Sequence, residues 1–336
     1  MKKTAVILLL AAVSAAAFCY RADIFTRKGA IIKRTRFMMD TLCTIQVPNE
    51  AGVSKTEAAI GRAFDRMAEI DGKFNCVNPE SPLYKFNKAR VPITDPEIAG
   101  VVGRALAISR ETGGAFDITV QPLVDLWGFF FASVSSRTVP SPQSVRRALS
   151  FTGWRRITIK NGAVFAADKN VRIDLGGIAK GYAIGEAVKV LKAAGVGSAL
   201  ILAGGQVQVF GSAAPGVPWK VGVRNPRKEG YIAGLGFDSE TGISTSGDYE
   251  RFFEVDGVRY HHILDPKTGY PARGVMSLSV VTTDPVRADA LSTALFVMGP
   301  ERALEFAKRR HGIEVIIVNA KGEVVTSQAP AGEIVR

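Results

Sequence analysis

The chain has 336 residues, of which 47% are hydrophobic and 22% charged. This size and mixture are typical of a globular protein with a full hydrophobic core, and they exclude intrinsic disorder, collagen and a coiled coil. The net charge of +12 is high, and on its own it would suit a nucleic acid or an anionic membrane as partner. The position of the basic residues decides how far this inference goes.

Residues 1–19 are predicted to be a signal peptide or a membrane anchor. Lys2 and Lys3 precede an uncharged run that ends at Phe18, and this run is shorter than the roughly 20 residues of a membrane-spanning helix. Three alanines before Phe18 suit a signal peptidase, whereas Cys19 leaves a lipid-anchored form open. A buried N-terminal helix is the alternative, but the run has no amphipathic pattern. We therefore expect an exported, periplasmic protein, with or without an anchor in the inner membrane.

Residues 20–36 are predicted to be a basic linker. Lys2 and Lys3 contribute two positive charges and residues 19–36 a further five, so only five remain on the other 300 residues. Those residues contain no dense run of lysine and arginine with interleaved aromatics, and we therefore expect no nucleic acid as partner. The basic linker opposes export by the positive-inside rule, which counts against an uncleaved anchor more than against export itself.

In chain order, periodicity and turn residues predict a mixture of strands and helices over the rest of the chain. The predicted strands are 42–47, 156–159, 163–166, 198–202, 219–223, 251–255, 278–282 and 314–318, and the predicted helices are 55–74, 96–112, 179–194, 287–297 and 302–311. Gly113 and Gly114 are expected to end the second helix in a left-handed turn. Because strands and helices do not alternate strictly, this order predicts an α+β fold with largely antiparallel sheets, in a single compact catalytic domain over residues 37–330.

The three cysteines, Cys19, Cys43 and Cys76, lack the spacing of a zinc site. Cys43 and Cys76 can form a disulfide in an oxidising compartment, but two buried thiols are the simpler interpretation.

Four clusters of residues carry the candidate chemistry. In the first, a strand reaching Asp174 is followed by Gly176 and Gly177 and by a helix that carries Lys180. Such a turn lets backbone groups approach a phosphate, although a tight turn with a solvated lysine would look the same. In the second, His261 and His262 precede Asp265-Pro266, and in an extended segment only one of the two faces a given site.

The third cluster pairs Asp289 with Thr293, which lie on one face of a predicted helix because they are four residues apart. A carboxylate and a hydroxyl suit Mg²⁺, although the threonine can instead bond within its own helix. The fourth cluster, residues 113–127, combines an aromatic, a carboxylate and an apolar stretch, and fits either a flat ligand or plain core.

Taken together, these clusters resemble the ApbE family of flavin transferases. The resemblance covers about residues 37–328 and rests on the segments MDT (39–41), GGAFDITVQPL (113–123), DLGGIAKGYA (174–183), LAGG (202–205), STSGDYERFF (244–253), HHILDPKTGYPA (261–272) and ADALSTALFVMG (288–299). It implies a Mg²⁺-dependent enzyme that splits FAD, releases AMP and joins FMN through its phosphate to a threonine of a target protein. The implied targets are flavin-carrying subunits of respiratory or electron-transfer complexes.

The resemblance also implies roles for individual residues. Asp289 and Thr293 match side-chain ligands of the metal, and Gly177 matches a position that offers it a backbone carbonyl. His262 matches the base for the acceptor hydroxyl, which leaves His261 as a bystander. Contacts to the flavin nucleotide are implied for Met39, Ala115, Phe116, Asp117, Asp174, Lys180 and Ile263.

Two positions depart from the family pattern. Asp40 lies where many relatives have glycine, and Val77 lies where a stacking tyrosine is common. Two other functions remain open at this point. The first is a FAD pyrophosphatase that gives FMN and AMP from the same site, and the second is an exported protein that only binds FAD.

Overall fold

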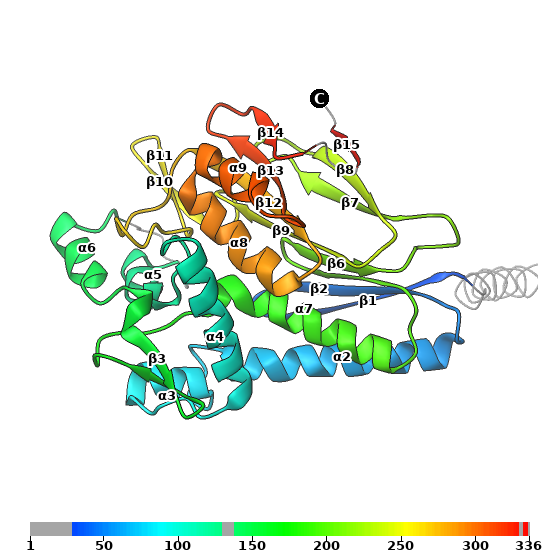
Figure 1. The fold of residues 1–336 in the computed structure, drawn as a ribbon, viewed down its shortest axis with the longest axis horizontal. Coiled ribbons are helices and arrows are strands. Elements are labelled where there is room, and N and C mark those ends of the chain that lie inside the picture. Colours follow the sequence, from blue (N-terminus) through cyan, green and yellow to red (C-terminus); the bar gives the residue numbers. More distant parts are fainter. Residues whose placement is uncertain (1–28, 130–137, 329–331, 335–336) are drawn as a thin grey trace, which may run out of the picture.

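The computed structural model describes residues 29–129, 138–328 and 332–334 (Figure 1). The predicted leader, residues 1–19, lies outside the described residues. The helices are α2 (Val53–Phe74), α3 (Pro82–Ala89), α4 (Pro96–Glu111), α5 (Gln121–Trp127), α6 (Pro142–Leu149), α7 (Gly176–Ala193), α8 (Pro285–Met298) and α9 (Pro300–Lys308), with short 3₁₀ turns at Ile118–Val120 and Trp154–Arg156. Within this part of the chain, no helix is both long and apolar enough to cross a membrane.

The strands form one large sheet and three small ones. They are β1 (Ile31–Met38), β2 (Thr41–Pro48), β3 (Ile157–Lys160), β4 (Ala163–Ala166), β5 (Ala199–Ala203), β6 (Gln206–Phe210), β7 (Trp219–Arg224), β8 (Tyr231–Phe237), β9 (Thr241–Gly247), β10 (Phe252–Val255), β11 (Val258–His261), β12 (Val275–Thr282), β13 (Glu314–Asn319), β14 (Val324–Thr326) and β15 (Gly332–Ile334). The large sheet has the order β1-β2-β5-β6-β9-β12-β13-β14, and all its neighbours pair antiparallel. The mixed, largely antiparallel α+β architecture is therefore confirmed.

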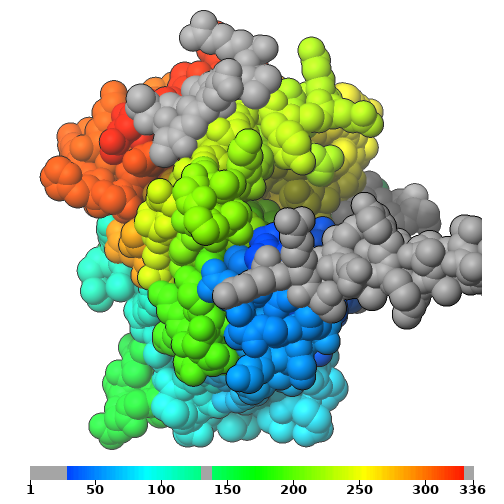
Figure 2. All heavy atoms as spheres, turned by 90° about the vertical axis from the view of Figure 1, so that its right-hand side faces the viewer, coloured from blue at the N-terminus to red at the C-terminus, as the bar shows by residue number. Residues whose placement is uncertain are grey.

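The large sheet separates two hydrophobic cores. On one face, α2, α7 and α8 bury Phe64, Ile184 and Leu291 against the sheet (Figure 1). On the other face, the small sheet β15-β8-β7 buries Trp219 and Leu235 against side chains of β5, β6, β9 and β13. Figure 2 shows the edges of this arrangement: the blue N-terminal elements and the red C-terminal ones lie on opposite sides of the green middle of the chain. Strands need such cover on both faces when both are apolar.

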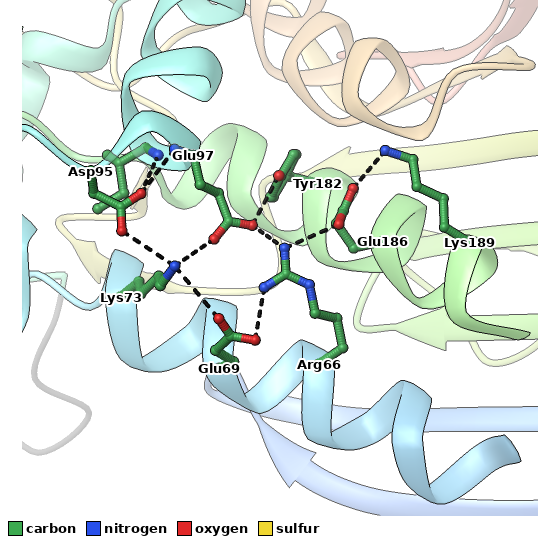
Figure 3. A network of polar contacts seen from close by, with 9 residues as sticks. Arg66, Glu69, Lys73, Asp95, Glu97, Tyr182, Glu186 and Lys189 are labelled. Carbon is green, nitrogen blue, oxygen red and sulfur yellow. Dashed lines mark hydrogen bonds and ion pairs between the residues drawn. The ribbon is translucent and has the colours of Figure 1, made fainter. Parts of the chain in front are cut away.

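Helix α8 is largely buried. Asp284 caps its start by accepting hydrogen bonds from the backbone N–H groups of Val286 (3.0 Å) and Arg287 (3.4 Å), and Pro285 occupies the first helical position. These are the preferred residues for a helix start. Its neighbour α7 is fastened on the other side by an ion-pair network that joins α2, α4 and α7 around Glu97 (Figure 3).

Two predicted features differ from the structure, and a third is confirmed. The predicted basic linker, residues 20–36, does not extend to residue 36, because Ile31–Met38 forms the edge strand β1 and pairs with β2 from Ile31 onward. Residues 171–175 belong to no strand, and α7 begins at Gly176 rather than near Ala179. The interpretation of Cys43 and Cys76 as two thiols is confirmed, with Cys43 buried and Cys76 half-buried. The extent of β1 is set by its pairing with β2.

Candidate active site

The start of α7 is the centre of the candidate site. Leu175, at the N-cap of this helix, makes no side-chain hydrogen bond to it. Instead, Asp174 Oδ1 accepts a hydrogen bond from the Gly176 N–H at 2.8 Å, and Lys180 Nζ donates to the Gly176 carbonyl at 2.9 Å. Burial raises the pKa of Asp174, and this rise is opposed by the Gly176 N–H and by the positive charges of Lys180 and Arg251. The positive end of a helix dipole beside a lysine favours an anionic ligand.

Helix α8 crosses α7 at very short range and brings Asp289 to the site. A Cβ on Gly181 would lie 2.3 Å from the Pro285 carbonyl oxygen and 2.9 Å from Asp289 Cβ, so glycine is required at the crossing. This approach lets Asp289 Oδ2 accept from the Gly181 N–H at 2.9 Å, while Oδ1 lies 4.0 Å from Lys180 Nζ. Asp289 is 4% exposed, and burial raises its pKa against the opposing effects of Lys180 and Gly181.

Thr293 lies one turn after Asp289, and its hydroxyl converges with Gly177 and Phe116. A Cβ built on Gly177 would lie 3.6 Å from Thr293 Oγ1 and 3.1 Å from Phe116 Cε2. On the sheet side, Ser246 Oγ lies 3.5 Å from Thr293 Oγ1 and 2.9 Å from Ser292 Oγ. The residues implied as metal ligands therefore lie where α8 crosses the first two turns of α7, and Thr293 lies next to the Ser246 hydroxyl of β9.

The donor atoms at this place are oxygens. Among the described residues, no group of three or more His, Cys, Asp or Glu side chains lies close enough to hold a metal ion. The candidate ligands Asp289, Thr293 and Gly177 offer none of the thiolate or imidazole groups that soft transition metals prefer. One carboxylate, one hydroxyl and backbone carbonyls instead fit a hard cation such as Mg²⁺, which takes few protein ligands and completes its shell with water and phosphate oxygens.

The two histidines have different environments. His261 is 3% exposed and makes two hydrogen bonds within its own loop. His262 is half-buried, its backbone N–H donates to the Arg251 carbonyl at 3.0 Å, and its buried Nδ1 has no hydrogen-bond partner among the described residues. Burial, together with the positive charges of His261, Arg251 and Lys180, lowers the pKa of His262 to about 3. Its ring is therefore neutral at physiological pH.

The β1–β2 turn reaches the site through Arg251. Met39 and Asp40 form the two-residue turn and both have left-handed backbone, with φ of 54° and 56°. The Met39 N–H donates to Asp71 Oδ2 at 2.9 Å, and Asp40 Oδ2 lies 3.7 Å from an Arg251 guanidinium nitrogen. A turn of this type favours glycine, so Asp40 keeps the expected turn shape at some cost in backbone energy.

The remaining implied nucleotide contacts are buried. Ala115, Phe116 and Ile263 are each at most 5% exposed. Asp117 accepts hydrogen bonds from the Thr119 N–H and hydroxyl through Oδ1, and from the Trp154 N–H through Oδ2. Both of its oxygens thus shape the turn that presents Phe116, rather than facing an open site. Val77 is 60% exposed, so nothing stacks on it within the described residues.

Sequence reasoning missed two residues that the fold places here. Ser246 contacts Thr293 and belongs to β9, where Ser244 and Ser246 alternate on the face toward α8. This alternation was a readable signal. Arg251 connects the Met39–Asp40 turn with His262, because its side chain lies near Asp40 and its backbone carbonyl accepts from the His262 N–H. No sequence pattern around Arg251 predicts these contacts.

Comparison with known proteins gives one consistent result. The ApbE family model matches residues 39–317. The FAD:protein FMN transferase of Treponema pallidum is 31% identical over 305 residues, which cover 85% of this chain and 83% of that protein, and the Escherichia coli K12 protein of the same name is 32% identical, with 80% and 79% covered.

The solved structures agree. The ApbE protein of Thermotoga maritima has a TM-score of 0.82 and 35% identity, covering 89% of this chain and 97% of its own. The Pseudomonas stutzeri flavinyl transferase ApbE in its apo form has a TM-score of 0.76 and 31% identity, with 88% and 93% covered. Since the match spans nearly the whole described chain in sequence and in fold, the protein belongs to the ApbE family.

Proposed function

We propose that the protein is a FAD:protein FMN transferase that attaches FMN to a threonine of a target flavoprotein and releases AMP. One observation carries the proposal: the crossing of α8 places Thr293 beside Gly177, and Asp289 beside Lys180 and Gly181, in the first two turns of α7. An arrangement of this kind suits a pyrophosphate with its metal ion. The relatives named above bear the name of this activity.

Asp289, Thr293 and the Gly177 carbonyl are the residues that would hold Mg²⁺. A bound ion would neutralise part of the negative charge of the pyrophosphate. The remaining work falls to the protein, because phosphoryl transfer depends mainly on positioning and electrostatics. Lys180 contributes a positive charge toward the phosphates, and Phe116 supplies an apolar wall next to Gly177.

His262 is proposed as the base. Its neutral ring takes the proton from the acceptor hydroxyl as that oxygen bonds to the FMN phosphorus, while the bond from this phosphorus to the AMP oxygen breaks and AMP leaves. The ring is neutral in the protein without its ligands, which leaves one ring nitrogen without a proton. The fixed backbone contact to Arg251 holds the residue in the site.

The acceptor is proposed to be a flavin-carrying subunit of a respiratory or electron-transfer complex. We propose that the enzyme modifies this subunit outside the cytoplasm. The support for export is the predicted leader of residues 1–19, and the basic residues that follow it support a position close to a membrane. The same features favour a periplasmic protein close to the inner membrane. Fractionation of cells that produce the full chain tests this location, and recovery in the cytoplasm would contradict it.

Mass spectrometry of a co-expressed flavoprotein subunit tests the activity. A mass gain equal to FMN on the subunit, absent when its acceptor threonine is changed to valine, supports transfer. Release of AMP without an adduct would instead identify a FAD pyrophosphatase, and bound FAD without AMP would identify a flavin-binding protein.

Two variants test the residue roles in that assay. Asp289→Ala is expected to abolish Mg²⁺-dependent release of AMP, and normal turnover would contradict the metal assignment. His262→Ala is expected to suppress transfer by at least about 100-fold while FAD still binds, as is typical when a general base is lost. Retained transfer would exclude His262 as the base.

A further inference from the structure

His261 is buried, and both nitrogens of its ring form hydrogen bonds to the backbone of one short loop. Its Nδ1 accepts a hydrogen bond from the Ile263 N–H at 3.3 Å, and its Nε2 lies 2.8 Å from the Ala272 carbonyl oxygen. A carbonyl only accepts and an N–H only donates, so the ring is neutral with its proton on Nε2. Burial lowers the pKa of His261 to about 4, in agreement with this neutral form.

These two bonds close the loop that follows His262. The loop is a narrow hairpin in which the Ala272 N–H donates to the Ile263 carbonyl at 2.9 Å and the Asp265 N–H donates to the Tyr270 carbonyl at 2.8 Å. The His261 ring lies at the open end of this hairpin and bonds both of its strands. It also meets Phe296 of α8 edge to face, with ring centres 5.5 Å apart.

The same bonds hold the backbone of His262 on both sides. The N–H of His262 donates to the Arg251 carbonyl, which restricts rotation before its Cα. The N–H of Ile263 belongs to the peptide after His262, so its bond to His261 Nδ1 restricts rotation on the other side. With both torsions restricted, the direction of the His262 Cα–Cβ bond is fixed, which limits the positions that its imidazole can reach. Phe296 lies three residues after Thr293, so the contact also ties this direction to α8.

We propose that His261 is a positioning residue for FMN transfer, which holds the His262 imidazole toward the acceptor hydroxyl through its Nδ1 bond to the Ile263 N–H. The inference rests on the proposed function, because it takes His262 as the base. It assigns a role to a histidine that would otherwise be a bystander. A misplacement of a reacting group by about 1 Å can cost about 100-fold in rate, so an indirect residue of this kind has a measurable effect.

Three substitutions test the two hydrogen bonds of the His261 ring individually. His261→Phe keeps the ring and its contact with Phe296 but removes both bonds. His261→Asn places Oδ1 where it can accept from the N–H two residues ahead, as asparagine commonly does in turns. His261→Gln reaches toward the Ala272 carbonyl as a donor instead. His311→Phe, at an exposed position in the turn after α9, is the matched control.

The assay is FMN transfer to a purified acceptor subunit, measured as kcat and as KM for FAD. His261→Phe is expected to lower kcat at least tenfold with KM for FAD within twofold of the wild type, His261→Asn to recover most of kcat, and His261→Gln to stay low. A kcat for His261→Phe within twofold of the wild type, or equal losses in the Asn and Gln variants, would overturn the proposal. If His261→Phe fails to fold, the Asn and Gln pair still decides.

Hydrogen exchange gives a readout that does not need activity. The Ile263 amide is expected to exchange slowly in the wild type and in His261→Asn, and at least tenfold faster in His261→Gln. Equal protection in all three proteins would refute the assigned bond. The activity of the wild type and of His311→Phe separates the two proposals: if neither attaches FMN, the proposed function fails, whereas active controls with an unaffected His261→Phe refute only the positioning role.

Discussion

At the scale of single residues, burial decides the protonation of the two histidines. An unfolded chain would carry both imidazoles with a pKa near 6.5, whereas in the fold the pKa of His261 falls to about 4 and that of His262 to about 3. Below pH 6.5 the unfolded state therefore binds more protons than the folded state. Stability from each neutral ring is present above the unfolded pKa and decreases as the pH falls toward the folded one.

His261→Gln removes one of these titrating rings. Between pH 7 and pH 5 its loss of unfolding free energy is expected to be smaller than that of the wild type by about 2 kcal/mol. Urea unfolding at the two pH values measures this difference, with His311→Gln at an exposed position as control. An unchanged pH dependence in His261→Gln would contradict a neutral, buried His261.

At the scale of elements, the crossing of α7 and α8 builds the site. The i, i+4 spacing of Asp289 and Thr293 was readable from the sequence, since it depends only on helical geometry. The partner of Asp289 was not, because the contact depends on how closely two helices approach. A missing Cβ at Gly181 allows that approach, and the sequence shows this glycine as one of several in α7.

Gly181→Ala is expected to destabilise the protein by about 3 kcal/mol, because the new methyl group would overlap the Pro285 carbonyl and Asp289 Cβ. It should also weaken Mg²⁺ dependence of the activity by displacing Asp289. Gly100→Ala is the control: its Cβ would meet nothing within 4 Å on exposed α4, and it should stabilise by about 1 kcal/mol. Thermal unfolding compares the two, and equal effects would sink the close-crossing argument.

The network around Glu97 joins α2, α4 and α7 (Figure 3). Glu97 Oε2 accepts from Lys73 Nζ at 2.8 Å, Oε1 accepts from the Tyr182 hydroxyl at 2.9 Å, and Arg66 pairs with the same carboxylate. Burial raises the pKa of Glu97, but these donors and charges outweigh it, so the pKa lies below its ordinary value. The network therefore stabilises the folded state at neutral pH, and this contribution is lost in acid.

Glu97→Gln is expected to cost about 2 kcal/mol at pH 7, because it leaves Arg66 and Lys73 partly buried with less compensating charge. This figure allows for solvent screening of the partly exposed Arg66 and Lys73 side chains. Glu69→Gln touches the same two cations from a 52% exposed position and should cost no more than about 0.5 kcal/mol. Urea unfolding at pH 7 decides, and similar losses in both variants would show that burial of Glu97 is unimportant.

At the scale of the whole molecule, the candidate site draws on residues from Met39 to Thr293. The β1–β2 turn, the start of α7, the β11–β12 loop and α8 all contribute to it. A ligand that bridges these elements stabilises the fold by mass action. At 100 times its dissociation constant, FAD with Mg²⁺ is expected to add about 3 kcal/mol to the free energy of unfolding.

Removal of the metal tests the same point. With FAD held constant, EDTA should cancel the metal-dependent part of the stabilisation in the wild type and have little effect in Asp289→Asn. Thermal unfolding with and without the chelator measures both. A metal-dependent shift of the same size in Asp289→Asn would place the ion elsewhere.

The sequence by itself determined the family, the α+β class, the helical pairing of Asp289 with Thr293 and the placement of His262 in a short polar motif, because each depends on local spacing or on a run of motifs in order. Tertiary structure decided the rest. It turned part of the basic linker into the edge strand β1, since a strand forms only where a partner such as β2 offers hydrogen bonds. It gave Asp117 internal partners, and it brought Arg251 beside the Met39–Asp40 turn. The contacts of Asp117 with Trp154 and of Asp40 with Arg251 join residues far apart in the chain, and only packing of the elements brings such residues together.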